Sequence, residues 1–575
     1  MLLPAMIQAS PSSVSLDGQL GFILLLALVL ALPISFGLIR RYRRAVAKSM
    51  RAGVSSLATD PISLAASPSP RQPLTSAPEL TFVHAASHIP TGSGVTAVYA
   101  EAFHAPWRTA AVYSVAGACY AIILSVANLA SEKAEINPLL FLLFFWIFFW
   151  PTVLTVNLVT AATRRAKLVS LIVYFLIFAV ISAVSFANSP KVSWGQIILM
   201  WAVSNLPPTL MLLTFLNRRV RAVGPLVLIF MIIALLGSQL PFFLAFRASD
   251  EITSGLMKVG SIVGLGPLGM LVGLTLLGFS IGCALGWLTL RLIRRLYERK
   301  KISDQSLTLD AIWLLFGFEA SLVLMLSGTL WIFSGLLAFL GFKVVAWVGF
   351  RLLRSKTMPS PKSTRLLLLR VFSPGKRSER LFSALATHWR HVGSIELIAG
   401  PDLATDTLEP HEFLDFLGGK LARRFIDGPQ ALDQRSSEMD NKPDQDGRFR
   451  VNDFFCHDDT WKMVLSRLVK ESNAVVMDLR GFTSQNKGCV FEIGELINVE
   501  PLEKVIFIVD DTTNEHLLME NMRQSWDRMK PTSPNRLSQS GQLQLFRFTG
   551  SRSGELRQLL LALCIAANTQ RSTAS

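Results

Sequence analysis

Long apolar runs dominate the first 355 residues of the chain. A membrane-spanning helix needs about 20 apolar residues, and nine runs reach or approach that length. They lie at 20–39, 110–130, 139–162, 168–186, 197–216, 223–246, 259–290, 311–328 and 330–350. The pattern predicts an α-helical multi-pass membrane bundle of about nine spans. The stretch 307–350 has a second interpretation, one long span followed by a helix at the membrane surface.

Basic residues gather in every second loop between these runs. The strongly basic loops are 164–167, 218–221 and 291–301, and the weakly charged or mixed loops are 131–137, 187–193 and 248–252. Lys and Arg are enriched in loops that stay on the cytoplasmic side of a membrane. The alternation therefore predicts which loops face the cytoplasm.

The two ends of the hydrophobic part fix its predicted orientation. Arg40 and Arg41 follow the first run, and no Lys or Arg precedes it, so we expect an uncleaved anchor whose N-terminus lies outside. The last run is followed by Arg351 and Arg354, which places the C-terminal part in the cytoplasm. The expected location is integral to a bacterial inner membrane or a plasma membrane.

The sequence divides into four predicted parts. Residues 1–44 form the anchor span, 45–105 a flexible linker rich in Ser, Ala and Pro, 106–356 the multi-span domain and 360–575 a water-soluble domain. Glu319 and Lys343 lie inside the hydrophobic hairpin at similar predicted depth. An unpaired charge is costly in a bilayer, so we expect them to form an intramembrane pair. That pair either locks the hairpin or belongs to an ion path.

From residue 360 onward, short apolar runs alternate with amphipathic segments. Five apolar runs have the length of a strand: 366–372, 395–399, 474–479, 505–509 and 543–548. A helix is predicted after each of them. Strands that are apolar nearly throughout are buried on both faces, which is typical of a parallel sheet covered by helices. The prediction is a flavodoxin-like α/β domain that binds ligands at the C-terminal ends of its strands. The polar segment 427–448 is predicted to be a mobile insertion.

The composition excludes several classes of partner. Of the 575 residues, 51% are hydrophobic and 17% charged, and the net charge is +16. Because the basic loops explain the excess charge, we expect a lipid bilayer as partner and no nucleic acid. The five cysteines are scattered and form no Cys-x-x-Cys pair, so neither a metal site nor a disulfide framework is predicted. No cofactor is predicted.

The segment from Asp478 to Glu492 carries the most chemical information. A strand delivers Asp478 to the edge of the sheet, a polar loop follows, and a helix then places Glu492 in its first turns. Arg370 and Ser373, at the end of the first predicted strand, are further candidates for ligand binding. The fingerprints of dinucleotide and nucleoside triphosphate sites, Gly-x-Gly-x-x-Gly and Gly-x-x-x-x-Gly-Lys-Ser/Thr, do not occur.

This segment resembles two related families. Cys489-x-x-Glu492 is similar to a motif of Toll/interleukin-1 receptor (TIR) domains, and Gly488, Glu492 and Gly494 match a pattern of nucleoside 2-deoxyribosyltransferases. The resemblance implies that Glu492 is the catalytic carboxylate in cleavage of an N-glycosidic bond, that Asp478 positions the ribose, and that NAD or a nucleoside is the substrate. It also implies homo-oligomers formed through this domain.

Three functions are open at this stage. The first is a membrane-anchored signalling or effector protein whose TIR-like domain binds or cleaves a nucleotide. The second is a non-enzymatic scaffold or sensor that uses the domain for protein contacts, with Glu492 an ordinary acid at a helix N-terminus, favoured by the helix dipole. The third is a transporter with a regulatory domain.

Overall fold

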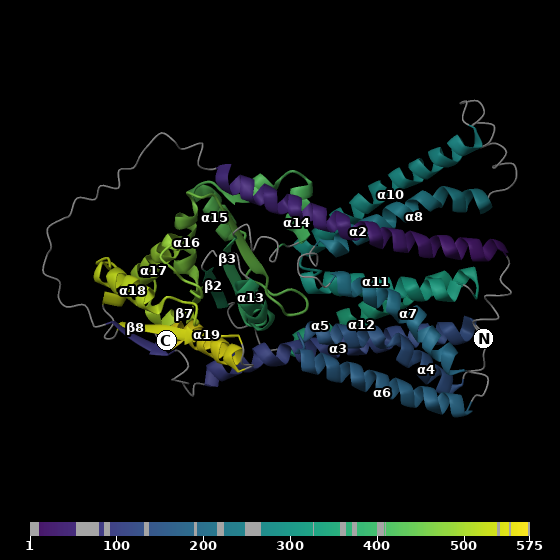
Figure 1. Ribbon diagram of the computed structural model, residues 1–575, viewed down its shortest axis with the longest axis horizontal. Coiled ribbons are helices and arrows are strands. Elements are labelled where there is room, and N and C mark those ends of the chain that lie inside the picture. The colour runs from purple at the N-terminus through teal and green to yellow at the C-terminus, as the bar shows by residue number, and fades with distance from the viewer. Residues whose placement is uncertain are drawn as a thin grey trace. The chain divides into compact units, whose positions relative to one another are not determined.

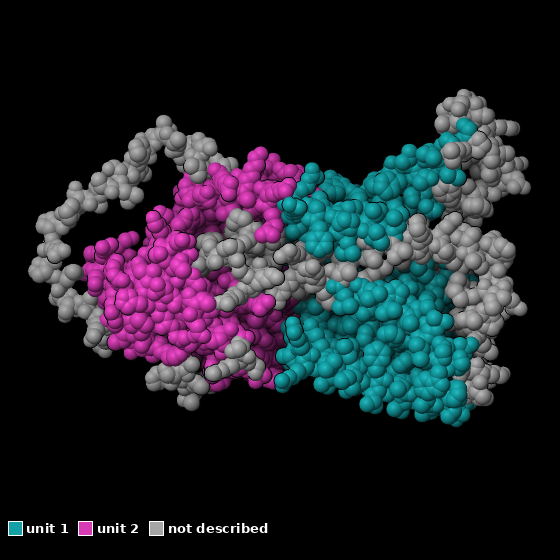
Figure 2. Space-filling model, viewed as in Figure 1, with its two compact units in different colours: residues 1–41, 107–355, 408–414 teal, residues 42–106, 356–407, 415–575 magenta. Residues whose placement is uncertain are grey.

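The computed structural model describes most of the chain as two compact units, shown in teal and magenta in Figure 2. The first, called the membrane unit here, contains 1–41, 107–355 and 408–414; the second, the sheet unit, contains 42–106, 356–407 and 415–575. The described residues are 11–52, 80–84, 93–131, 137–188, 193–215, 223–247, 266–325, 327–356, 364–370, 376–399, 408, 410–536, 541–550 and 554–572.

Helices make up the membrane unit (Figure 1). They are α2 (Pro11–Ala52), α3 (Ser93–Ser131), α4 (Pro138–Phe148), α5 (Trp150–Val159), α6 (Arg164–Asn188), α7 (Trp194–Phe215), α8 (Gly224–Arg247), α10 (Pro267–Glu298), α11 (Asp304–Met325), η2 (Thr329–Phe333) and α12 (Ser334–Lys356). The C-terminal end of α2 and the N-terminal end of α3 belong to the sheet unit.

Seven helical segments among the described residues are long and apolar enough to cross a membrane. They are Val98–Ser131, Pro138–Val159, Arg164–Asn188, Gly224–Pro241, Gly269–Glu298, Asp304–Met325 and Ser334–Leu353. These segments indicate an integral membrane protein that contacts a lipid bilayer. The stretch 307–350 forms two helices, α11 and α12, rather than one long span.

The structure thus supports about seven spans rather than the nine predicted. The predicted runs 20–39 and 197–216 have no counterpart among the seven. Both runs fall on helices, α2 and α7, but several side chains of each helix, and residue 216, lie outside the described residues.

A single tryptophan organises the core of the membrane unit. The Trp313 ring of α11 stacks on Phe342 of α12, with centroids 4.2 Å apart, and meets the Tyr120 ring of α3 at 4.9 Å. Its indole nitrogen donates a hydrogen bond of 3.1 Å to the Thr155 hydroxyl on α5. Gly117 leaves the necessary space, because a Cβ atom there would lie 2.9 Å from the Trp313 ring. Four helices therefore meet at one side chain.

Glycines bring α8 and α10 into close contact. A Cβ atom at Gly237 would lie 2.5 Å from the Cα atom of Gly282, and one at Gly278 would lie 2.4 Å from the carbonyl oxygen of Gly237. Close approach of helix backbones through small residues is a usual mode of association in membranes, where van der Waals packing replaces the hydrophobic effect. These glycines therefore set the distance between the two helices.

In the part of the chain that the structure describes, the sheet unit is built on eight strands, all paired in parallel. They are β1 (Leu80–His84), β2 (Thr364–Arg370), β3 (Gly393–Ala399), β4 (Phe425–Ile426), β5 (Val451–Cys456), β6 (Ala474–Asp478), β7 (Val505–Val509) and β8 (Gly541–Arg547), in the order β1-β8-β7-β6-β2-β3-β5-β4. The predicted parallel α/β sheet is confirmed. The five predicted strands, β2, β3, β6, β7 and β8, lie in the spatial order 2-1-3-4-5, which is the flavodoxin-like order.

Strand β1 comes from the segment for which the sequence predicts a flexible linker. Its five residues pair with β8, from Leu80 beside Gly541 to His84 beside Leu545. Phe82 packs against the sheet core, where the Arg523 guanidinium lies 5.9 Å from its ring centroid. A strand that lies between α2 and α3 in the chain thus completes one edge of the sheet.

Helices cover both faces of the sheet. The helices that follow α12 in the chain are α13 (Lys376–Trp389), α14 (Pro410–Leu417), η3 (Leu421–Arg424), α15 (Pro429–Ser437), α16 (Trp461–Glu471), α17 (Lys487–Val499), η4 (Leu502–Lys504), α18 (Glu515–Asp527), η5 (Pro534–Arg536) and α19 (Glu555–Ser572). Residues 410–414 of α14 belong to the membrane unit. Helices α16, α17 and α18 share one buried cluster with Met477 of β6. The residue after Met477 in β6 is Asp478, and its carboxylate accepts a hydrogen bond from the Ser378 hydroxyl of α13. Successive side chains of a strand point to opposite faces, so α13 covers the other face.

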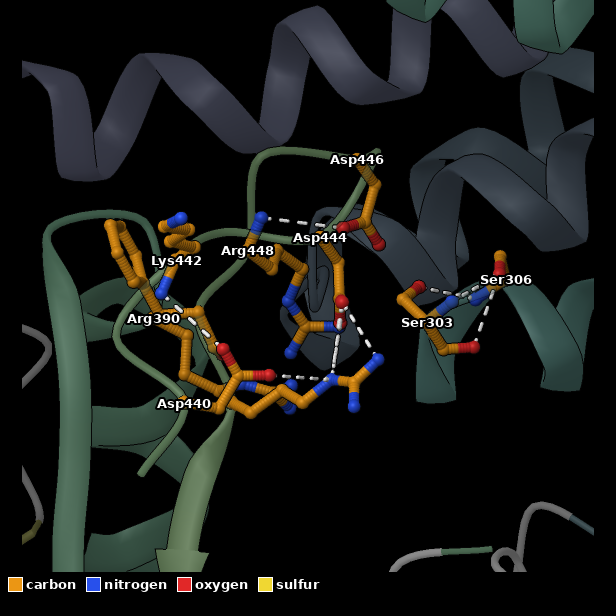
Figure 3. A network of polar contacts seen from close by, with 10 residues as sticks. Ser303, Ser306, Arg390, Asp440, Lys442, Asp444, Asp446 and Arg448 are labelled. Carbon is orange, nitrogen blue, oxygen red and sulfur yellow. Dashed lines mark hydrogen bonds and ion pairs between the residues drawn. The ribbon is translucent and has the colours of Figure 1, made fainter. Parts of the chain in front are cut away.

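The segment 427–448, predicted to be a mobile insertion, contains α15 and an ordered loop. Asp440, Lys442 and Asp444 lie in this loop (Figure 3), where the Lys442 amide donates to the Asp440 carboxylate. The Asp444 carboxylate accepts hydrogen bonds of 2.9–3.1 Å from the guanidinium of Arg450, and both side chains are buried. A bidentate ion pair of this kind fixes the relative orientation of the two side chains. The polar segment therefore contains a helix and an acid that takes part in a buried ion pair.

The close packing of α8 and α10 generates a stability prediction. We expect Gly282→Val to lower the melting temperature of the detergent-solubilised protein, because the added atoms would meet the backbone of Ala234 at about 2.8 Å. Overpacking of this kind costs about 1–3 kcal/mol. The matched control is Gly273→Val on the same helix, where a Cβ atom meets nothing within 4 Å. Equal melting temperatures for the two variants would contradict this account of the packing.

Candidate functional site

The carboxyl edge of the sheet contains a topological switch point. Strand β2 lies between β3 and β6. The chain places β3, β4 and β5 on one side of β2, and then β6, β7 and β8 on its other side. In open parallel sheets the crevice beyond the strand ends at such a point is the usual place for a ligand. Arg370 and Asp478 are the last residues of β2 and β6, and they are paired in register.

The Asp478 carboxylate is fully engaged by protein groups. Its oxygens accept hydrogen bonds from Arg480 Nε at 2.8 Å and Nη2 at 2.7 Å, and from the Ser378 hydroxyl at 3.0 Å. Asp478 and Arg480 are both nearly buried, with 4% and 6% of their side chains exposed. In this arrangement Asp478 holds Arg480 in place, a role that differs from the predicted contact with ribose.

Arg480 in turn lines a cleft at this edge. Its guanidinium carbon lies 5.4 Å from the centroid of the Phe548 ring, an arrangement that supports a cation on an aromatic face. The cleft has a volume of about 470 Å³. Its lining residues come from α13 and from the segments that follow β6, β7 and β8: Arg380, Leu381, Ala384, Arg480, Asp510, Asp511, Thr512, Phe548, Thr549 and Gly550.

The cleft offers both cationic and acidic groups. Arg380 is exposed and has no ion-pair partner among the residues that the structure describes. Asp510 accepts from the Thr512 amide at 2.9 Å and from its hydroxyl at 2.5 Å, which fixes the turn after β7. The Glu555 carboxylate accepts from the Gly550 amide at 2.8 Å and so fixes the turn after β8. The walls of the cleft are therefore pre-organised, and Arg380 supplies free positive charge.

Glu492 lies on α17 but does not line the cleft. It is 3% exposed, and its Oε2 atom is buried with no hydrogen-bond partner among the described residues. Burial raises the pKa of the Glu492 carboxyl from 4.5 to about 8, although the positive charge of Arg370 opposes this shift. At neutral pH the group is therefore mainly protonated, because a buried charge lacks solvation.

The other predicted ligand residues differ in their placement. Arg370 is buried, with its carbonyl oxygen 4.0 Å from the Cys489 sulfur. Gly488 is exposed at the start of α17, and Gly494 faces α18, where a Cβ atom would lie 4.0 Å from the Ser525 hydroxyl. Neither glycine position requires the absence of a side chain. Ser373 lies outside the described residues.

Lys343 pairs with another acid than the predicted Glu319. Lys343 Nζ donates to Asp310 Oδ2 at 2.7 Å, which joins α12 to α11. Glu319 is on α11, nine residues further along the chain than Asp310. Sequence position alone placed Glu319 and Lys343 at equal distance from the turn, but the helices align Lys343 with the earlier acid.

Sequence reasoning missed the residues that line the cleft, Arg380, Arg480, Thr512 and Phe548. Three of them follow the ends of strands, which was the available signal. No group of three or more His, Cys, Asp or Glu side chains that could hold a metal ion occurs in the described part of the chain. Comparison with protein-family models, curated proteins and solved structures found no match for this chain.

The buried acid generates a pH prediction. In the unfolded chain the Glu492 carboxyl ionises near 4.5, and in the folded protein near 8. Its contribution to stability is therefore full below about pH 4.5 and is lost as the pH rises through 8. Glu492→Gln mimics the protonated form. We expect its stability advantage over the unchanged protein to grow by about 1.4 kcal/mol per pH unit across this window, to a few kcal/mol at most.

The measurement is the difference in melting temperature between the two full-length proteins in detergent, followed from pH 5 to pH 9. Glu503→Gln removes an exposed carboxyl of the same unit and serves as control. A difference for Glu492→Gln that stays constant with pH would show that the carboxyl does not titrate in this window.

Proposed function

We propose that this is a membrane-anchored signalling or effector protein whose sheet unit binds a nucleotide such as NAD. The observation that carries the proposal is the cleft beside the ends of β6, β7 and β8, with Arg380 and Arg480 on its walls. Guanidinium groups match the geometry of phosphate oxygens with two parallel hydrogen bonds. The Asp510 and Thr512 side chains are acceptors and donors of the kind that bind ribose hydroxyls.

Asp478 has a positioning role in this proposal. Its carboxylate holds the Arg480 guanidinium by hydrogen bonds, and the Phe548 ring packs against the same guanidinium. Phe548 is itself buried, so we assign it to support of the guanidinium rather than to stacking on a base. Phosphate recognition therefore depends on Arg380 and Arg480 together.

The proposal predicts the effect of removing the exposed arginine. Arg380→Ala should raise the Kd of the full-length protein for NAD, ADP-ribose or AMP by about 10-fold to 100-fold, because a hydrogen bond to a charged group contributes about 1.5–3 kcal/mol. The measurement is calorimetric or fluorescence titration in detergent. Arg528→Ala, an exposed arginine outside the cleft, is the matched control. Unchanged affinity in Arg380→Ala, or no binding of any of the three ligands, would refute the proposal.

A second candidate function is hydrolysis of the N-glycosidic bond of the bound nucleotide. It is favoured by the buried, unpartnered Oε2 of Glu492 and by the resemblance of its segment to TIR domains and nucleoside 2-deoxyribosyltransferases. Water would add to the anomeric carbon as the carbon–nitrogen bond breaks. Nicotinamide would leave NAD as a neutral base with the bonding electron pair, and the water would release a proton to solvent. An ionised Glu492 would stabilise the positive charge that develops on the sugar.

Base release from NAD tests this second function. It should rise as the pH increases toward 8, when Glu492 ionises, and should disappear in Glu492→Gln. The assay uses full-length protein at concentrations that allow self-association, with Glu503→Gln as control. Release that persists in Glu492→Gln would exclude Glu492 as the catalytic carboxylate, while nucleotide binding without any release would leave binding as the function.

We further propose that the sheet unit lies in the cytoplasm and the N-terminus outside. Pairing of β1 with β8 puts His84 and Thr364 on the same side of the membrane, so the chain must cross an even number of times between them. The seven candidate spans all lie in that interval. The described helix that supplies an eighth crossing is α7, whose 22 residues extend about 33 Å.

With α7 crossing, the basic ends of α6, α10 and α12 fall on the side of the sheet, as cytoplasmic segments do. The carbonyl oxygen of Met50, near the end of α2, accepts from the Asp458 amide at 3.2 Å, so this end also lies on the side of the sheet. The apolar run of α2 then leads to an N-terminus outside.

Cysteine accessibility tests this topology. Ser193→Cys precedes α7, and Gly266→Cys lies between α8 and α10; both positions are exposed. If α7 and α8 both cross, an impermeant maleimide should label both cysteines from the outside of intact cells. Thr163→Cys, between α5 and α6, should react only after the cells are opened. Labelling of Ser193→Cys and Gly266→Cys from opposite sides would show that α7 does not cross.

A further inference from the structure

The final turns of α2 present one apolar side and one basic side. Tyr42 and Val46 are completely buried, and the Tyr42 ring meets the edge of Phe416 with centroids 5.4 Å apart. The exposed side carries four cations, called here the α2 basic patch: Arg43, Arg44, Lys48 and Arg51. Arg44, Lys48 and Arg51 follow one another at intervals of four and three residues, so they align along the helix.

No described residue of the protein neutralises the charge of the α2 basic patch. None of its four side chains forms an ion pair with another described residue. The sequence from 39 to 52 contains no Asp or Glu, and Arg40 and Arg41 precede the patch on the same helix. By contrast, Arg294 near the end of α10 is paired with Glu298 at 2.7 Å. The patch is therefore a concentrated source of positive potential.

Tertiary contacts fix the direction in which the patch faces. The end of α2 is held by the segment after β5, where the His457 ring nitrogen lies 2.8 Å from the Ser49 carbonyl oxygen and the Asp458 amide donates to the Met50 carbonyl. With Tyr42 and Val46 turned into the sheet unit, rotation of α2 about its axis is excluded. The cations must face away from the sheet unit.

With α2 crossing the membrane, as the proposed topology has it, the position of the patch in the chain matches the headgroup layer of a bilayer. The apolar run of α2 ends at residue 39, and a helix rises about 1.5 Å per residue, so Arg43 and Arg44 lie within about 8 Å of its end. The polar layer of one leaflet is about 5–8 Å thick. Lys48 and Arg51 follow within reach of the surface potential of anionic lipids, which extends over about one Debye length.

We propose that the α2 basic patch binds the headgroups of anionic phospholipids, with phosphodiester oxygens on Arg43 and Arg44. The contact would hold the end of α2, together with the segment after β5 that it contacts, at the membrane surface. This proposal is independent of the nucleotide site. The shared chemistry is an anionic phosphate, so the test must distinguish a lipid surface from a soluble phosphate compound.

The test uses full-length protein in nanodiscs of phosphatidylcholine and phosphatidylglycerol, doped with photoactivatable analogues of each lipid. Cross-linked peptides are then mapped by mass spectrometry. The phosphatidylglycerol analogue should label residues 39–52 several-fold more than the phosphatidylcholine analogue. Arg43→Gln/Arg44→Gln should remove this preference, since each basic residue near an anionic surface is worth about fivefold in binding. Arg43→Lys/Arg44→Lys should keep most of it and shows that the fold tolerates substitution there.

The control is Arg164→Gln/Arg165→Gln, which removes the same charge from the exposed start of α6 and should leave labelling of α2 unchanged. Equal labelling by the two lipid analogues, or a preference that survives Arg43→Gln/Arg44→Gln, would overturn the proposal. Loss of the preference on addition of millimolar glycerol phosphate would also overturn it, because it would indicate a pocket for soluble phosphate.

Discussion

The pairing of β1 with β8 constrains the whole protein. Five residues that precede the first candidate span lie in register with Gly541–Leu545, the edge of a sheet whose other strands follow the last span. Strands that are paired by backbone hydrogen bonds lie side by side, so the two segments share one side of the membrane. The sheet is therefore not a module appended to the end of the chain. It is closed by a strand that comes from between α2 and α3, and the number of crossings between β1 and β2 must be even.

The candidate site separates recognition from chemistry. In the proposed function Arg380 and Arg480 bind phosphate, and Asp478 keeps Arg480 aligned through a buried ion pair. Loss of one partner in such a pair typically costs about 3–5 kcal/mol, so this alignment is stable. Glu492 lies apart from the cleft lining, and burial keeps its carboxyl mainly neutral. Ligand binding therefore requires no change at Glu492, whereas bond cleavage requires that its carboxyl ionise and gain access to the sugar.

The sequence predicted the elements that hydrophobic patterning alone specifies. The apolar run 505–509 corresponds to β7, because a strand buried on both faces needs little else. Strand β5 escaped prediction since Asn452 and Asp453 interrupt its apolar pattern, and both are buried in the sheet. β1 was hidden beside a segment rich in Ser, Ala and Pro. At the site, Asp478 and Glu492 were found from strand ends and a motif. Arg380 could not be found, because only tertiary packing of α13 brings it beside the loops that follow β6, β7 and β8.

The central claim is that a phosphate-bearing nucleotide binds in the cleft beside the ends of β6, β7 and β8. The most direct measurement is an experimental structure of the full-length protein in nanodiscs with ADP-ribose bound. The account predicts density for the diphosphate in the cleft, between Arg380 and Arg480, with the Arg480–Asp478 ion pair intact. Density for the ligand at another place on the protein, or an empty cleft at saturating ligand, would contradict it.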